Sequence, residues 1–444
     1  MDNNHASYEE SSFCINAERL SFKTIDKKNG ARTISNEDMP AFIHEWWHYI
    51  QDISTISAQN GFYLWTRDFA RLSQITCNGT KKTIHLPLDK DEFGEPFDKD
   101  RALFRIFCGQ KEEYDLHDCK IEGVTIEQYP VAYSGTNINF AKCQVEINKK
   151  HYNFGLLALQ ELNAYYIQRI TESFLPNVNF NVPASTLPTF PYHLGDMLFD
   201  YYNIHTDEKT KFIISMQCLD SIQAPAVFLN VLKKLMNSSI NYVSDRSSLN
   251  EVIYQAMQES SCSNLDVNIE WVKDYKQWIE ASSLTKEYRG ALKWYIQQIY
   301  NCSFVKQNAE EIFPLIASGS LEELSKLYET FPAPLIKIGS EILGSQQTFG
   351  AVTKETFDTY NNALIIWTSR RVYDLLRAKS KDEINERARC VLCDGCKNKA
   401  KVGNPYLCST SFFSIANGRK KVKCPMMFAL ANIGLWQNTI EVDI

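Results

Sequence analysis

Apolar side chains recur at helical spacing over much of this 444-residue chain, and the first clear helix follows a short mixed N-terminal segment. Either Asn36 or Asp38 can cap this helix, because Pro40 then falls in its first turn. Its apolar positions lie three or four residues apart, as one face of a helix requires. These positions are Ile43, Trp46, Trp47, Ile50 and Ile53. A second helical pattern follows over residues 62–75.

The pattern changes between about residues 77 and 153, where short β-prone runs are separated by turn residues. The run over 143–147 is followed by Asn148-Lys149-Lys150, which predicts a turn into a second strand over 151–154. A long helix is then expected from Gly155 past Ile170. This part of the chain therefore mixes strands with helices.

Three zones follow one another along the chain, and the sequence contains no internal repeat. Residues 1–236 have the mixed pattern expected of a catalytic domain. Residues 237–389 open with a Ser/Asn-rich stretch and are nearly all helical in pattern, as in a helical scaffold or lid. Residues 390–444 form a Cys-rich module and tail. We therefore predict an α+β, mostly helical protein with these three domains.

Charge and composition exclude some classes of partner. The net charge of −6 at pH 7 is mild, so neither nucleic acid nor an anionic membrane is an expected partner. The first residues, Met1-Asp2-Asn3-Asn4, lack the basic start and apolar run of a secretory signal. The longest apolar run, near residues 426–436, is about half the length of a membrane span. We therefore expect a cytoplasmic protein.

The strongest chemical signal is His44-Glu45-Trp46-Trp47-His48, an HExxH pattern on the first predicted helix. Residues four apart lie on one helix face, so the two imidazoles can hold one zinc ion. Glu45 can reach a water on that ion, take its proton and pass it to a leaving group, which makes it the candidate catalytic base. The structural alternative is a pair of core histidines, because the flanking residues are uncharged and suit a buried helix.

A catalytic zinc needs a third protein ligand. A metzincin would have glycine at 51 and histidine at 54, and Gln51 and Ser54 exclude that arrangement. A glutamate from a later helix remains, and Glu161 is the candidate because its helical neighbours are apolar or aromatic. A carboxylate on such a face is costly without a cation, which zinc would supply. The structural alternative is a pairing of Glu161 with an arginine or lysine.

These motifs resemble those of a known class. His44-Glu45-Trp46-Trp47-His48 followed by Glu161-Leu162-Asn163-Ala164-Tyr165 resembles the gluzincin class of zinc metallopeptidases, whose third ligand is a glutamate in an ExxxA- or ExxA-like helix. The finer pattern of His48-Tyr49-Ile50-Gln51, with Gly155 and Ala158 ahead of the glutamate, is similar to a group of bacterial HExxH proteins. The resemblance covers roughly residues 40–236.

The resemblance implies a zincin-like α+β fold with a cleft over the metal. It also implies that an extended peptide binds along an edge strand near the metal, and the hairpin before the Glu161 helix is the candidate. Asp52 lies one turn beyond His48, so it is expected to orient a ligand histidine.

Hydrolysis also needs a hydrogen-bond donor for the developing oxyanion besides the metal. Four residues are candidates by their type: Tyr165, Tyr166, His151 and His193. Spacing does not choose among them. We take Tyr165 and His193 forward as catalytic candidates beside Glu45, and the alternative for each is a structural role.

Five of the 13 cysteines lie close together near the C-terminus. They are Cys390, Cys393, Cys396, Cys408 and Cys424. In a cytosolic chain this density predicts metal binding rather than disulfides, and four thiolates would close a structural zinc site. An iron–sulfur cluster is the alternative, because Cys424-Pro425 faintly resembles a ferredoxin run. Free or redox-active thiols are the third interpretation.

The sequence thus predicts a zinc metallopeptidase that acts on protein or peptide substrates. The helical domain and Cys-rich module exceed what catalysis requires, which suggests regulation by a partner protein or signal. Two alternatives remain open, a zinc-stabilised scaffold or sensor and a hydrolase of small-molecule amides. The intact Glu45 favours catalysis, because a purely structural site has no use for a general base.

Overall fold

The structure is a computed structural model of the whole chain. It describes residues 6–9, 12–26, 31–78, 83–88, 107–109, 112–116, 119–133, 136–237, 246–260, 265–282, 284–308, 320–338, 341–344, 354–390, 392–393, 408, 412, 425–432, 435 and 439–442.

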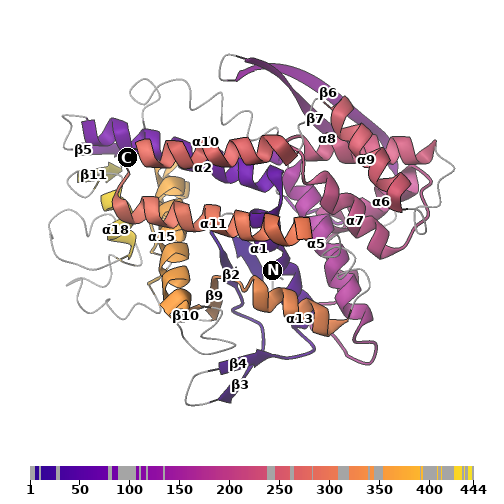
Figure 1. Ribbon diagram of the computed structural model, residues 1–444, viewed down its shortest axis with the longest axis horizontal. Coiled ribbons are helices and arrows are strands. Elements are labelled where there is room, and N and C mark those ends of the chain that lie inside the picture. Colours follow the sequence, from indigo (N-terminus) through magenta and orange to yellow (C-terminus); the bar gives the residue numbers. More distant parts are fainter. Residues whose placement is uncertain are drawn as a thin grey trace.

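Helices dominate these residues (Figure 1). The α-helices are α1 (Met39–Ser54), α2 (Ile56–Asn78), α5 (Leu156–Ser173), α6 (Leu194–Tyr201), α7 (Glu208–Cys218), α8 (Ala224–Met236), α9 (Arg246–Glu259), α10 (Leu265–Ala281), α11 (Lys286–Asn308), α13 (Leu321–Thr330), α15 (Lys354–Leu376), α16 (Lys381–Arg387) and α18 (Pro425–Asn432). Short 3-10 and π segments are η1 (Ala184–Thr186) and η2 (Thr189–His193). The prediction of an α+β, mostly helical fold is confirmed.

The strands form small separate sheets. They are β1 (Ser7–Glu9), β2 (Cys14–Asn16), β3 (Phe22–Asp26), β4 (Ala31–Ile34), β5 (Thr83–Leu86), β6 (Ile121–Tyr133), β7 (Thr136–Ile147), β8 (Lys150–Phe154), β9 (Leu335–Ile338), β10 (Glu341–Gly344) and β11 (Thr439–Val442). The four-stranded sheet has the order β1-β2-β9-β10, which leaves β1 at one edge. Strands β6, β7 and β8 form an antiparallel meander, and β6 and β7 extend as a long ribbon beside α8 (Figure 1).

Two parallel strand pairs join distant parts of the chain. Strand β2 pairs with β9, and β5 pairs with β11 near the C-terminus. The buried apolar side chains also form one cluster that includes Phe13, Leu292 and Leu430 from the three predicted zones. The zones are therefore in contact through a common core, and the domain boundaries at 236 and 389 stay predictions.

Helix α1 lies at the centre of this core. Both of its tryptophans, Trp46 and Trp47, are fully buried, and the helix packs against α2, α5 and α11. Asp38 precedes the helix as predicted, but its carboxylate does not cap it. It accepts hydrogen bonds from the Ser21 N–H and the Ser35 hydroxyl instead, at 2.8 and 3.2 Å. The Asp38 carboxylate therefore bonds to Ser21 and Ser35 instead of the helix N-terminus, where the sequence predicted a cap.

The hairpin ahead of α5 is confirmed. Strands β7 and β8 pair in antiparallel register, with Ile147 opposite Lys150. The two turn residues between them, Asn148 and Lys149, have positive φ values of 51° and 59°, as a tight hairpin turn requires. The long helix predicted from residue 155 is α5. No helix among the described segments combines the length and apolar character needed to cross a membrane.

Candidate metal centre

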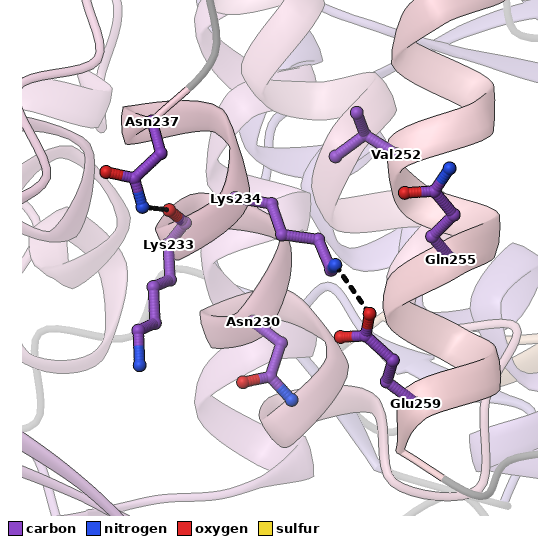
Figure 2. Close-up of a pocket in the computed structure, with 7 residues that line it drawn as sticks. All are labelled: Asn230, Lys233, Lys234, Asn237, Val252, Gln255 and Glu259. Atoms are coloured by element: carbon purple, nitrogen blue, oxygen red, sulfur yellow. Dashed lines mark hydrogen bonds and ion pairs between the residues drawn. The ribbon is translucent and has the colours of Figure 1, made fainter.

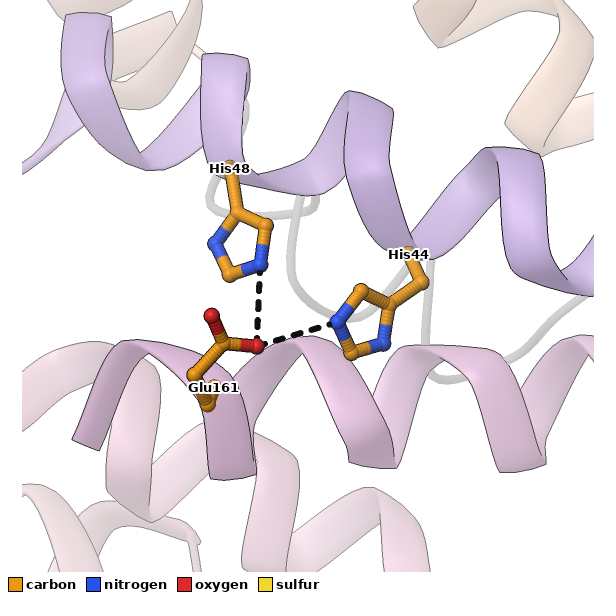
Figure 3. A group of neighbouring side chains, drawn as sticks. All are labelled: His44, His48 and Glu161. Carbon is orange, nitrogen blue, oxygen red and sulfur yellow. Dashed lines mark hydrogen bonds and ion pairs between the residues drawn. The ribbon is translucent and has the colours of Figure 1, made fainter. Parts of the chain in front are cut away.

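Helices α1 and α5 bring three potential ligands together. His44 and His48 extend from one face of α1 towards Glu161 on α5 (Figure 3). The Nε2 atoms of both histidines are 3.2 Å from Oε2 of Glu161. Among the described residues, this is the group of His, Cys, Asp or Glu whose ligand atoms all lie within 4.8 Å of one another. The predicted ligand set is thus assembled in space.

The sequence left open whether Glu161 pairs with an arginine or lysine instead of belonging to a metal site. Among the residues that the structure describes, its ion-pair partners are His44 and His48 rather than an arginine or lysine. Burial opposes ionisation, but the charge of His48 and hydrogen bonds from both imidazoles outweigh it and lower the pKa of the Glu161 carboxyl. An anionic carboxylate facing two imidazole nitrogens is a donor set that fits zinc.

Buried hydrogen bonds hold the two helices in register. The side-chain oxygen of Asn163 on α5 accepts from Trp47 Nε1 at 2.8 Å and from Gln51 Nε2 at 3.0 Å. The amide nitrogen of Asn163 donates to the Phe212 carbonyl and to Ser215 Oγ on α7, at 3.1 and 2.8 Å. One fully satisfied side chain therefore ties α1, α5 and α7 together directly beside the ligands.

Gln51 determines which nitrogen of His48 faces Glu161. Its amide NH2 donates to Asn163 and to the Gln160 carbonyl, so its oxygen must act as the acceptor. That oxygen lies 2.9 Å from Nδ1 of His48. The Nδ1 proton is therefore used, and the Nε2 lone pair is left for a metal in neutral His48.

Asp52 does not have the role expected for it. It accepts a hydrogen bond from the Tyr8 hydroxyl at 2.7 Å, and the orientation of His48 depends on Gln51. Helix spacing allows either residue to meet His48, and the tertiary contacts of Asp52 with Tyr8 and of Gln51 with Asn163 decide between them. The buried Nδ1 of His44 has no hydrogen-bond partner among the described residues.

Glu45 lies beside the ligands but outside the group. Its burial raises the pKa of its carboxyl, and nearby Glu161 adds to that effect. The charges of His44 and His48 and a hydrogen bond from the Tyr8 backbone act in the opposite direction. A carboxylate with a raised pKa next to a metal-binding group is suited to accept a proton at neutral pH.

A cleft of about 210 Å³ opens over the group. His44, Glu45 and Glu161 line it together with Tyr8 from β1 and Tyr192 from η2. The Tyr192 ring centroid is 5.7 Å from that of His44. Neither tyrosine was singled out from the sequence, because each reaches the site from a segment with no motif of its own. The nearest sequence signal was His193, which directly follows Tyr192.

Tyr165 and His193 contact each other rather than the cleft. The Tyr165 hydroxyl is 3.1 Å from Nδ1 of His193 and accepts a hydrogen bond from Arg169 at 3.0 Å. The other nitrogen of His193 faces the Leu187 carbonyl at 3.0 Å. Neither residue is among those that line the cleft, so we propose no catalytic role for them.

Part of the cysteine cluster lies in the described residues. Cys390, Cys393 and Cys408 are buried and make no disulfide. The Cys390 N–H donates to the Cys408 carbonyl at 2.8 Å, and the Cys393 N–H donates to the Cys390 carbonyl at 3.0 Å. Cys396 and Cys424 lie outside the described residues. Metal binding by the cluster therefore stays a prediction.

A second hollow, of about 440 Å³, lies between α8 and α9 (Figure 2). Lys234 pairs there with Glu259 at 2.7 Å, and the Asn237 side chain donates to the Lys233 backbone carbonyl at 3.0 Å. No histidine, cysteine or second acidic residue lines it within the described segments. The candidate site is therefore the cleft over α1 and α5, where the predicted ligands lie.

Comparisons with known proteins add no relative. The chain matches no protein-family model, no curated protein and no solved structure.

Proposed function

We propose that this protein is a zinc-dependent hydrolase of amide bonds, and specifically a peptidase. One observation carries the proposal. His44, His48 and Glu161 converge from two helices, while the Glu45 carboxylate stands beside them in an open cleft. A structural metal site would have no use for a general base that stands outside the ligand group.

The donor set supports zinc over other metals. Two imidazole nitrogens and one carboxylate leave a tetrahedral position open, as in hydrolytic zinc sites. The same set can hold iron(II) in oxygenases, where no adjacent base is required. Glu45 next to His44 therefore favours zinc and hydrolysis.

Different residues have different roles in the proposed reaction. Zinc, when bound, supplies a Lewis acid that polarises the substrate carbonyl and acidifies water. Glu45 takes a proton from the attacking water as the new C–O bond forms, then delivers it to the leaving nitrogen as the C–N bond breaks. Burial and then the charges of Glu161 and Glu113 raise the pKa of the Tyr192 hydroxyl, which therefore keeps its proton at neutral pH. Tyr192 lines the cleft, and its hydroxyl is the candidate donor to the oxyanion once it turns away from Glu113.

An edge strand supports a peptide substrate. Ala6, Ser7 and Tyr8 line the cleft, and the last two belong to β1, which pairs on one side only within its described sheet. Extended peptides bind such edges by adding a strand. The sequence named the hairpin before α5 as the candidate edge, but no residue of the β7–β8 hairpin is among the cleft lining.

The small cleft volume also suits a second candidate, a hydrolase of small-molecule amides.

Glu45→Gln tests the proposal. The amide keeps the size of the side chain but cannot accept a proton, so zinc content should be unchanged while amide hydrolysis falls by about 10²–10⁴-fold. Purified wild-type and variant protein would be compared for zinc by mass spectrometry and for cleavage of a peptide library. The variants His44→Ala and His48→Ala should each lose one zinc equivalent per chain. Unchanged zinc in both histidine variants would contradict the site, and wild-type hydrolysis by Glu45→Gln would contradict the mechanism.

A further inference from the structure

Glu113 adds a carboxylate to the mouth of the cleft. It lies on a segment between β5 and β6 and is more exposed than Glu45 and Glu161, the other acidic residues lining the cleft. The Tyr192 hydroxyl donates a hydrogen bond to its Oε1 at 3.4 Å. No feature of the sequence near Glu113 indicated this position, because it lies 48 residues before Glu161.

Backbone contacts keep Glu113 at this place. The next residue, Tyr114, exchanges two backbone hydrogen bonds with Phe190, of 3.1 and 2.9 Å. Phe190 precedes Tyr192 in η2, so this single bridge brings the two cleft residues together. The rings of Tyr114 and Phe190 also pack against each other, with centroids 6.1 Å apart.

A close approach of two glycines holds the start of this segment against α5. The backbone of Gly109, with φ of +76°, packs on Gly155, the residue before α5. A Cβ atom on Gly155 would lie 2.3 Å from the Gly109 nitrogen, so only glycine allows this contact. The segment that leads to Glu113 is thus anchored on the helix that carries Glu161.

The described lining of the cleft is acidic when its histidine, His44, acts as a neutral metal ligand. Three carboxylates line it, and no lysine or arginine is among its lining residues in the described part of the chain. When all three carboxylates are ionised, their total charge is one negative charge more than a bound dication neutralises. Partial burial and then the charge of Glu161 raise the pKa of Glu113, while the hydrogen bond from Tyr192 lowers it.

We propose that Glu113 makes this site select substrates with an ammonium group close to the scissile amide. The inference rests on the proposed hydrolase function and names its substrate class. The ammonium group can come from a free peptide N-terminus or from a lysine side chain, since both present the same charge to Glu113. The Tyr192 hydroxyl positions the Glu113 carboxylate at the cleft mouth before the oxyanion of the substrate forms.

Binding of three hydroxamates to the zinc-loaded protein tests the proposal without turnover. The probes are Leu-Gly-hydroxamate with a free α-amine, Nα-acetyl-Lys-Gly-hydroxamate with a free ε-amine, and Nα-acetyl-Leu-Gly-hydroxamate with neither. Titration calorimetry at a pH near 6.5 keeps both amines protonated. We expect at least one charged probe to bind about three- to fivefold more tightly than the neutral probe. The tighter of the two identifies the source of the ammonium group.

Two variants complete the test. Glu113→Gln should bind the charged and neutral probes with equal Kd, and its binding of the neutral probe shows that the fold is intact. Glu112→Gln changes the exposed neighbour in the same way and should keep the preference. Equal binding of all three probes to the wild-type protein would overturn the role of Glu113 but not the hydrolase. Failure of zinc-loaded protein to bind any hydroxamate would instead overturn the proposed function itself.

Discussion

Gln51 lies three residues after His48 on α1, and its side-chain oxygen is 2.9 Å from Nδ1 of that histidine. The same amide donates to α5 through the Gln160 carbonyl and Asn163. The contact that orients the imidazole is thus also one that joins the two ligand-bearing helices. Positioning of a ligand and packing of the helices depend on the same side chain.

Gln51→Leu should therefore weaken zinc binding without removing a ligand. Leucine has a similar volume but offers no acceptor to the Nδ1 proton, and loss of such an outer partner typically lowers metal affinity by about 10–100-fold. Competition with a chelator of known affinity would measure the change. Gln74→Leu is the matched control, since Gln74 is exposed on α2. An unchanged zinc Kd in folded Gln51→Leu would show that Gln51 does not orient the ligand.

Asn163→Ala should destabilise the fold as well as the site. The substitution removes the acceptor of the buried Trp47 indole N–H and leaves a cavity between α1, α5 and α7. A buried donor without a partner costs about 1–3 kcal/mol, and the cavity adds to that loss. Urea denaturation of the metal-free protein would measure it. Asn301→Ala, on the exposed face of α11, should change stability by less than about 0.5 kcal/mol.

Zinc binding should release a proton at neutral pH. Burial alone would lower the pKa of His48, but the charge and hydrogen bond of Glu161 outweigh it and raise the pKa to about 10 in the metal-free protein. His48 is therefore protonated at pH 7, and a metal must displace that proton. Apparent zinc affinity should rise by about tenfold per pH unit between pH 7 and 9. Calorimetry in buffers of different ionisation enthalpy measures the proton count, and a buffer-independent enthalpy would contradict the prediction.

The same shift affects the metal-free fold. Because the folded-state pKa of His48 lies above the ordinary value of 6.5, its pairing with Glu161 stabilises the fold fully below that value. The stabilisation is lost as the pH rises towards about 10. His48→Ala should remove this part of the pH dependence, which urea denaturation across that range would reveal.

Cys393→Ser tests the predicted metal module. If Cys393 binds a structural zinc, the variant should lose one metal equivalent and melt at a lower temperature, because metal-binding energy in such modules is folding energy. The zinc at His44 and His48 should be retained. Cys119→Ser, at a half-buried cysteine outside the cluster, is the control. An absorption band near about 400 nm in the wild-type protein would indicate an iron–sulfur cluster instead of zinc.

The sequence alone determined the local parts of the site. Spacing of four residues places His44 and His48 on one helix face whatever the rest of the fold, and an acidic residue among apolar neighbours indicated that Glu161 needs a cation. The hairpin before α5 was also predictable, because turn residues and alternating β-prone runs act over a few positions. The shared helix face and the hairpin are confirmed, because their physical cause lies within a few residues of its effect, and a cation at Glu161 stays a prediction.

Only the tertiary structure decided how distant segments complete the cleft. Tyr8, Glu113 and Tyr192 reach it through β1, the Tyr114–Phe190 bridge and η2, and none has a neighbouring motif. Gln51 rather than Asp52 meets His48 for the same reason. Tyr192, rather than Tyr165 or His193, likewise lines the cleft because of how these segments approach one another. Which polar group meets a ligand depends on the approach of α1, α5 and η2 to one another, and helix spacing does not contain that distance.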